Sequence, residues 1–81
     1  MEQEILHILQ EINPYMEIET DTKLLEEEIL DSMEILLLIS ELEDKYQMQI
    51  PLESLQLEDF QDILSITKFV KKQIEGTQYD N

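Results

Sequence analysis

The sequence predicts a small all-α protein with three main helices, one short helix and a long loop between the first two helices. Three segments repeat Ile and Leu at the spacing of a single helix face, which is typical of amphipathic helices packed on a core. One Gly and two Pro in 81 residues leave few interruptions, and 42 % of the residues are hydrophobic. A chain of this length is expected to form one domain over residues 1–81.

The first helix is expected over residues 2–12. Four of its apolar residues share one face: Ile5, Leu6, Leu9 and Ile12. Ile8 lies on the flank of that face. Asn13 and Pro14 should end the helix, because the residue before a proline is disfavoured in the helical region. His7 is expected to project away from the apolar face.

Residues 13–31 form a long acidic connection that we expect to pack against the core. The expectation rests on the apolar residues scattered through it: Tyr15, Met16, Ile18, Leu24, Leu25, Ile29 and Leu30. Leu24 and Leu25 should anchor the loop, and Ile29 and Leu30 should bring the chain to the next helix.

The second helix is expected from Asp31 or Ser32 to Tyr46 or Gln47. Asp31 is a suitable N-cap residue, and Glu34 three positions later completes the pattern of a capping box. The core side of the helix is predicted from its periodicity to contain Ile35, Leu38, Ile39, Leu42 and Tyr46.

The opposite side of this helix carries an apolar strip that contains Met33 and Leu37, with Leu36 between the two faces. Acidic residues edge the strip: Glu34, Glu41, Glu43 and Asp44. A helix buried on two sides would give the same pattern, but so short a chain can hardly cover both sides. We therefore predict a docking surface for other proteins, to which Glu34, Leu36, Leu37 and Glu41 contribute.

The C-terminal third should contain a turn, a short helical segment and the last helix. Residues 48–51 predict a turn or extended piece, and residues 55–60 a single helical turn with Leu55 and Phe60 directed inward. Asp62 is the expected N-cap of a helix from residue 63 to about 74, which Gly76 should end.

The face of this last helix that should meet the core contains Ile63, Ile66, Val70 and Ile74, with Phe69 at its edge. Its lysines should lie near the C-terminal end, where cations complement the helix dipole: Lys68, Lys71 and Lys72. Residues 77–81 are expected to form a frayed tail.

The composition limits the classes of molecule that this protein is expected to bind. A net charge of −15, from 20 acidic and 5 basic residues, repels nucleic acid and anionic membranes and attracts basic proteins. The absence of Cys excludes disulfides and thiolate metal sites. No apolar run reaches bilayer-spanning length and no signal-like N-terminus is present, so we expect a cytoplasmic monomer without membrane insertion.

Ser32 stands where the long loop meets the second helix. The first N–H groups of a helix have no intrahelical acceptor, and the helix dipole places partial positive charge there. A phosphate ester on the Ser32 hydroxyl would find donors and favourable charge at this position. Ser32 is therefore a candidate for phosphate-linked modification, although an Asp-Ser pair at a helix start is by itself most often a plain cap.

The stretch Asp21–Met33, which reads DTKLLEEEILDSM, resembles the acyl and peptidyl carrier protein family, in which an Asp-Ser-Leu-like triplet opens the second helix after a long loop. The similarity extends over roughly residues 5–74. It includes the LEDKY segment at Leu42–Tyr46, the Ile50–Pro51 pair, and Phe60 followed by Ile63 and Ile66.

This resemblance implies that Ser32 receives 4′-phosphopantetheine from coenzyme A through a phosphopantetheinyl transferase, with Asp31 and Met33 beside it. The arm would supply the thiol that the chain lacks and hold an acyl or aminoacyl group as a thioester. An adenylating ligase or acyltransferase would load the arm. Downstream biosynthetic enzymes would recognise the acidic side of the second helix at Glu34 and Glu41. The protein itself would not be an enzyme, and it would have no metal and no catalytic residues.

The sequence departs from the family pattern in three ways. Met33 replaces the commoner Leu, and Glu28 stands where many relatives have Gly. Leu36 and Leu37 make the docking face more apolar than in typical fatty-acid-synthesis carriers, where acidic residues are denser. The run from Leu24 to Met33 looks most like free-standing D-alanyl and aminoacyl carriers. The cargo stays open between D-alanine for cell-wall polymers, another amino acid, and an acyl or aryl acid for secondary metabolism.

Other classes of function are less well supported. A catalytic triad would have to use His7, the only histidine, and the acidic run Glu26–Glu28 lacks the spacing of a calcium loop. The tyrosines are not interleaved with basic residues, as a nucleic-acid stacking surface requires. The main rival is an acidic, non-enzymatic interaction or inhibitor protein, which would have no need of Ser32.

Overall fold

The computed structural model describes the backbone of residues 1–79 and the side chains of residues 1–51 and 53–75. In this range it contains three α-helices and two 3-10 segments, without strands: α1 (Glu2–Ile12), α2 (Ser32–Tyr46), η1 (Leu52–Ser54), η2 (Leu57–Phe60) and α3 (Ile63–Tyr79). The all-α prediction is confirmed. The count of four helices is not confirmed, because the short helical turn expected at residues 55–60 is the 3-10 segment η2 and not an α-helix. The segment η1 was not predicted.

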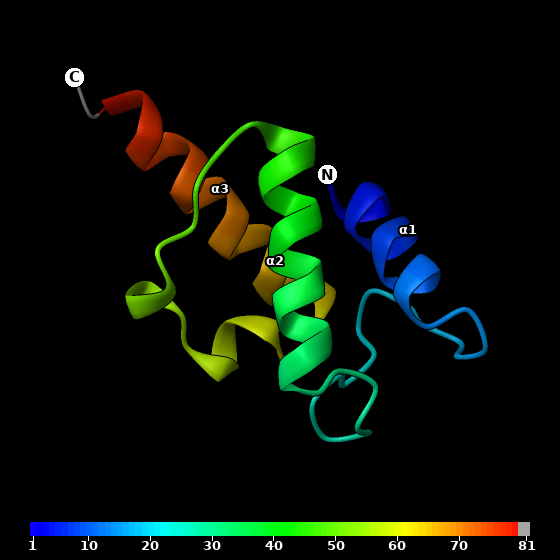
Figure 1. Cartoon of the computed structure of the whole chain (residues 1–81). Coiled ribbons are helices and arrows are strands. Elements are labelled where there is room, and N and C mark those ends of the chain that lie inside the picture. The colour runs from blue at the N-terminus through cyan, green and yellow to red at the C-terminus, as the bar shows by residue number, and fades with distance from the viewer. Residues whose placement is uncertain (80–81) are drawn as a thin grey trace.

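The helices are arranged so that α1 contacts both α2 and α3. Figure 1 shows α1 and α2 running in opposite directions, with α3 crossing behind α2. The segment η2 packs against α3. The long loop from α1 closes the lower end of the molecule in Figure 1 and leads into the first turn of α2.

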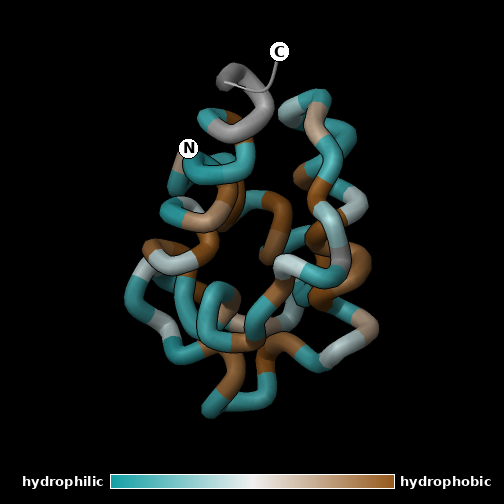
Figure 2. Tube along the Cα trace, turned by 90° about the vertical axis from the view of Figure 1, so that its left-hand side faces the viewer, coloured by the Kyte–Doolittle hydropathy of each residue, from teal (hydrophilic) through white to brown (hydrophobic). Residues whose placement is uncertain are grey.

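The core lies between the helices and is formed by the apolar faces that the periodicity predicts. Hydrophilic residues occupy much of the outward-turned parts of the chain (Figure 2). The largest fully buried side chains come from every α-helix, the loop and η2: Phe60, Ile5, Leu9, Leu24, Leu38, Leu42, Ile63, Ile66 and Val70. The rings of Phe60 and Phe69 meet at a tilt of 55° with centroids 5.6 Å apart, which holds η2 on α3.

The long loop is packed down as predicted, although two of its apolar residues are not part of the packing. Ile18, Leu24, Ile29 and Leu30 are buried, whereas Leu25 is only partly buried. The exposed pair is Tyr15 and Met16. Leu24 is the main anchor, because its side chain is fully buried and its N–H donates to the Gln61 carbonyl at 2.8 Å.

The last helix is longer than predicted. It continues through Gly76 to Tyr79, so Gly76 does not end it, and the predicted frayed tail is helical at residues 77–79. A single glycine raises the free energy of a helix by only about 1 kcal/mol, which does not stop a helix that is already formed. Residues 80–81 lie outside the described residues.

The extension of α3 also changes the position of its lysines. Lys68, Lys71 and Lys72 lie in the middle of the helix, and its last turn contains no basic residue. The predicted interaction of this lysine cluster with the C-terminal end of the helix dipole is therefore wrong, since that effect is confined to the last turn.

Candidate functional site

The first turn of α2 is closed by a complete capping box. Asp31 has an extended backbone, and its Oδ1 accepts a hydrogen bond from the Glu34 N–H at 2.9 Å. The Asp31 N–H donates in return to Glu34 Oε1 at 3.2 Å. The Asp31 carbonyl also accepts from the Ile35 N–H at 2.9 Å, so three hydrogen bonds fix the backbone on either side of Ser32. The predicted N-cap and its partner are both confirmed.

Ser32 is the first residue of α2, and it is exposed. Among the described residues, the N–H groups of Ser32 and Met33 have no hydrogen-bond acceptor, as is usual for the first turn of a helix. Two backbone donors and the positive end of the helix dipole therefore lie beside the serine hydroxyl. These groups suit a phosphate ester, whose oxygens accept hydrogen bonds and carry negative charge.

The loop that leads to Ser32 is held by its own hydrogen bonds. The N–H groups of Ile29 and Leu30 both donate to the Leu24 carbonyl, at 2.9 and 3.1 Å. The Asn13 side-chain amide donates to the Ile29 carbonyl at 2.9 Å, which ties the end of α1 to the same turn. Glu28 adopts a positive φ of 57°, a left-handed conformation that Gly adopts more readily than other residues. The chain thus reaches Ser32 along a fixed path.

The apolar strip of α2 is exposed, as predicted. Met33 is 70 % exposed, Leu37 55 % and Leu36 50 %, so this part of the helix is not covered by the rest of the described chain. Glu41 is exposed beside it. Glu34 is partly buried, and its carboxylate already accepts the Asp31 N–H.

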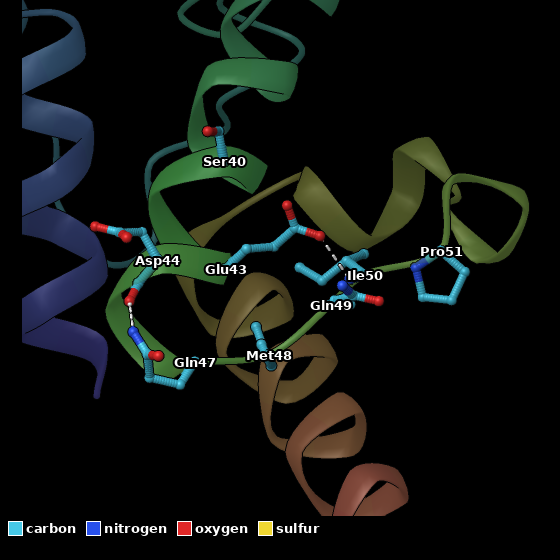
Figure 3. Close-up of a pocket in the computed structure, with 8 residues that line it drawn as sticks. All are labelled: Ser40, Glu43, Asp44, Gln47, Met48, Gln49, Ile50 and Pro51. Atoms are coloured by element: carbon cyan, nitrogen blue, oxygen red, sulfur yellow. Dashed lines mark hydrogen bonds between the residues drawn. The ribbon is translucent and has the colours of Figure 1, made fainter.

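Glu43 does not edge the strip. Its side chain is partly buried and turns toward the segment after α2, where its Oε2 accepts a hydrogen bond from the Ile50 N–H at 2.7 Å (Figure 3). Gln47, in the left-handed conformation, ends α2, and its side chain donates to the Asp44 carbonyl at 2.7 Å. A hollow of about 960 Å³ lies at this end, away from Ser32, and is lined by Ser40, Glu43, Asp44, Gln47, Met48, Gln49, Ile50 and Pro51.

A second cluster, which sequence reasoning missed, joins the start of α1 to the end of α2. The Tyr46 hydroxyl donates to Glu4 Oε1 at 2.9 Å, and Lys45 Nζ lies 3.8 Å from the other carboxylate oxygen. The amino group of Met1 is 3.8 Å from Glu4 Oε1. Burial, the hydrogen bond to Glu4 and the charge of that carboxylate raise the pKa of Tyr46 to about 12. No local sequence signal connects residues so far apart in the chain.

The described residues offer little material for other chemistry. His7 is exposed on α1, as predicted, and within the described part of the chain it makes no hydrogen bond to a serine. No group of three or more His, Asp or Glu side chains in residues 1–79 is arranged to hold a metal ion. Within the same range, none of the helices has both the length and the apolar character needed to span a bilayer.

Comparison with protein-family models, with curated proteins and with solved structures gives no match for this chain.

Proposed function

We propose that this protein is an acyl or aminoacyl carrier, with Ser32 as the attachment site of a 4′-phosphopantetheine arm. The observation that supports this most strongly is the position of Ser32: an exposed hydroxyl at the first residue of a capped helix, beside two N–H groups that have no acceptor among the described residues. The similarity of the Asp21–Met33 stretch to carrier proteins supports the same assignment.

Attachment would form a phosphodiester bond between Ser32 Oγ and the pantetheine phosphate of coenzyme A. Adenosine 3′,5′-bisphosphate would leave, and the hydroxyl proton would pass to a base of the phosphopantetheinyl transferase. The N–H groups of Ser32 and Met33 are placed to stabilise the phosphate, and Asp31 and Glu34 keep the turn in shape. The arm would supply the thiol that holds the cargo as a thioester.

The protein itself acts as a substrate that other enzymes load and unload, and is not a catalyst. An adenylating ligase or an acyltransferase loads the arm, and downstream biosynthetic enzymes take the cargo. Met33, Leu36, Leu37 and Glu41 give these partners an apolar strip with an acidic border, and a net charge of −15 favours basic partner surfaces. We propose that this helical-bundle carrier works in the cytoplasm, in secondary-metabolite or cell-wall-related biosynthesis. D-alanine is one candidate cargo.

The test uses the absence of Cys from the chain. Unmodified protein gives no signal in a thiol titration, so any thiol found after incubation with coenzyme A and a broad-specificity transferase, followed by removal of coenzyme A, belongs to the arm. We expect one thiol per chain for the wild type and for Ser40→Ala, a control at an exposed serine farther along α2. Ser32→Ala should give none while keeping its helical circular dichroism. A thiol on Ser32→Ala would refute the assignment.

The partner surface is tested separately with loaded protein. Met33→Asp and Leu37→Asp change exposed side chains, so both variants should keep wild-type helicity. Each should slow transfer of cargo from a cognate ligase or to an acceptor enzyme. Wild-type transfer rates in both variants would remove the strip from the proposed interface without affecting Ser32.

The second candidate is an acidic interaction protein that binds a basic partner, and the charge of −15 favours it. This function does not use the Ser32 hydroxyl. Binding of a basic partner that is equally tight for wild type and Ser32→Ala, together with no thiol gain in either protein, would select this candidate.

A further inference from the structure

A groove lies between α1 and α2 and is separate from the first turn of α2. Its volume is about 310 Å³, and it is lined by Ile8, Glu11, Ile12, Leu37 and Glu41. Three of these five side chains are apolar, and Leu37 is 55 % exposed. The volume is at the lower limit for small-molecule sites, which suits the groove better to a few side chains of another polypeptide.

The two polar residues of the groove are both acidic and both exposed. Glu11 comes from α1 and Glu41 from α2, so both helices of the groove contribute a carboxylate. Neither carboxylate is paired with a cation in the part of the chain that the structure describes. An apolar floor with unpaired carboxylates is complementary to an apolar stripe flanked by basic side chains.

The geometry of α2 separates this groove from the rest of the exposed strip. Successive residues of an α-helix point about 100° apart, so Leu36 and Leu37 lie on different flanks of the helix. Leu37 lines the groove beside α1, whereas Leu36 does not. The groove also depends on α1, a helix to which the Ser32 site assigns no role in recognition.

We propose that the groove between α1 and α2 binds an amphipathic helix of a partner protein, with an apolar stripe flanked by Lys or Arg. The apolar side chains of the partner would lie over Ile12 and Leu37, and its basic residues would pair with Glu11 and Glu41. Such helix-in-groove recognition uses apolar residues at i, i+3, i+4 and i+7. The inference does not require the arm, because no groove residue belongs to the turn that contains Ser32.

The first experiment measures binding of a synthetic peptide of about 18 residues, long enough to form a helix, with one Leu face and Lys on both sides of it. A peptide of the same composition in shuffled order is the control. We expect the patterned peptide to bind more tightly, and Leu37→Ala to weaken its binding by at least about fivefold. Leu64→Ala, at a similarly exposed leucine of α3, should leave the dissociation constant unchanged.

The second experiment tests the charge assignment. Glu11→Lys and Glu53→Lys change the net charge equally, and both residues are exposed. Glu53 belongs to η1, which Figure 1 shows on the other side of α2 from α1. We expect Glu11→Lys to weaken peptide binding by at least about fivefold, with a much smaller effect from Glu53→Lys. Equal effects would mean that the peptide senses only the total charge, which would overturn the proposal.

Two further outcomes would also overturn it. If Leu36→Ala weakens binding more than Leu37→Ala, the peptide lies on the other flank of α2. If the peptide does not bind but the chain forms a dimer that Leu37→Ala dissociates, the groove is an interface between two copies. Peptide binding is measured on wild type and on Ser32→Ala, and loading of Ser32 is measured on wild type. If wild type is loaded but does not bind the peptide, only the groove proposal fails. If wild type binds the peptide but is not loaded, only the carrier proposal fails.

Discussion

The N-cap of α2 offers a quantitative link between the fold and the candidate site. In Asp31→Ala, the Glu34 N–H loses its 2.9 Å acceptor and the capping box is broken. Loss of an N-cap side chain lowers the free energy of unfolding by about 1 kcal/mol. For a domain of this size that corresponds to a fall of about 4–8 °C in the midpoint of thermal unfolding. The first turn then frays, and the donors beside Ser32 are no longer held in place.

A matched control exists in α3, where Asp62 Oδ1 accepts the Ser65 N–H at 2.8 Å. Asp62→Ala removes an equivalent cap and should lower stability by a similar amount, about 1 kcal/mol. The assay is thermal unfolding by circular dichroism, together with the initial rate of Ser32 loading by a transferase. We expect Asp31→Ala to slow loading by about fivefold and Asp62→Ala to leave the rate unchanged at a temperature where both are folded.

The reasoning fails if both variants lose the same stability and load at the same rate, because Ser32 would then not depend on its own turn. It also fails if Asp31→Ala unfolds at the wild-type temperature. Asp31→Asn should keep much of the stability, since an amide oxygen also caps a helix.

Three further predictions concern the rest of the fold. Glu28→Gly should raise the urea midpoint, with a gain of up to about 1 kcal/mol, because Gly relieves the positive φ of 57°. Leu38→Ala should lower the free energy of unfolding by about 2–5 kcal/mol, since Leu38 is fully buried, whereas Leu37→Ala on the exposed side should change it by less than about 0.5 kcal/mol in chemical denaturation. The pKa of Tyr46 is raised in the folded state, so folding favours the neutral form of its hydroxyl. The stability that Tyr46 contributes is therefore complete below pH 10 and is lost as the pH rises through about 12. Because the pair with Glu4 is partly exposed, we expect a loss of about 1 kcal/mol over this window, measured by denaturation at each pH and absent from Tyr46→Phe.

Local signals predicted most of the helical structure. The bounds of α1 and α2, the capping box of Asp31 and Glu34, and the cap of α3 at Asp62 all agree with the sequence reading. These features depend on residues within a few positions of one another. Periodicity also identified which side of α2 is exposed, because a helix face is fixed once its buried residues are known.

Features that depend on tertiary contacts or on small energy differences were not predicted. The helix continues through Gly76 because the cost of one glycine is small. Glu43 turns away from the strip to accept the Ile50 N–H, and Tyr46 meets Glu4 from the other end of the chain. Glu28 has a left-handed backbone, which could not be predicted because the position is not occupied by Gly or Asn, the residues typical of that conformation. The groove between α1 and α2 likewise exists only once the two helices are packed.

The role of Ser32 is tested most directly by the intact mass of the protein after incubation with coenzyme A and a phosphopantetheinyl transferase, followed by fragmentation to locate any added group. The chain has four serines, of which Ser32 alone begins an α-helix. We predict a gain of one phosphopantetheinyl group per chain, located on Ser32. A folded protein that gains no mass with several transferases, or that carries the group on Ser40, Ser54 or Ser65, would contradict the carrier assignment.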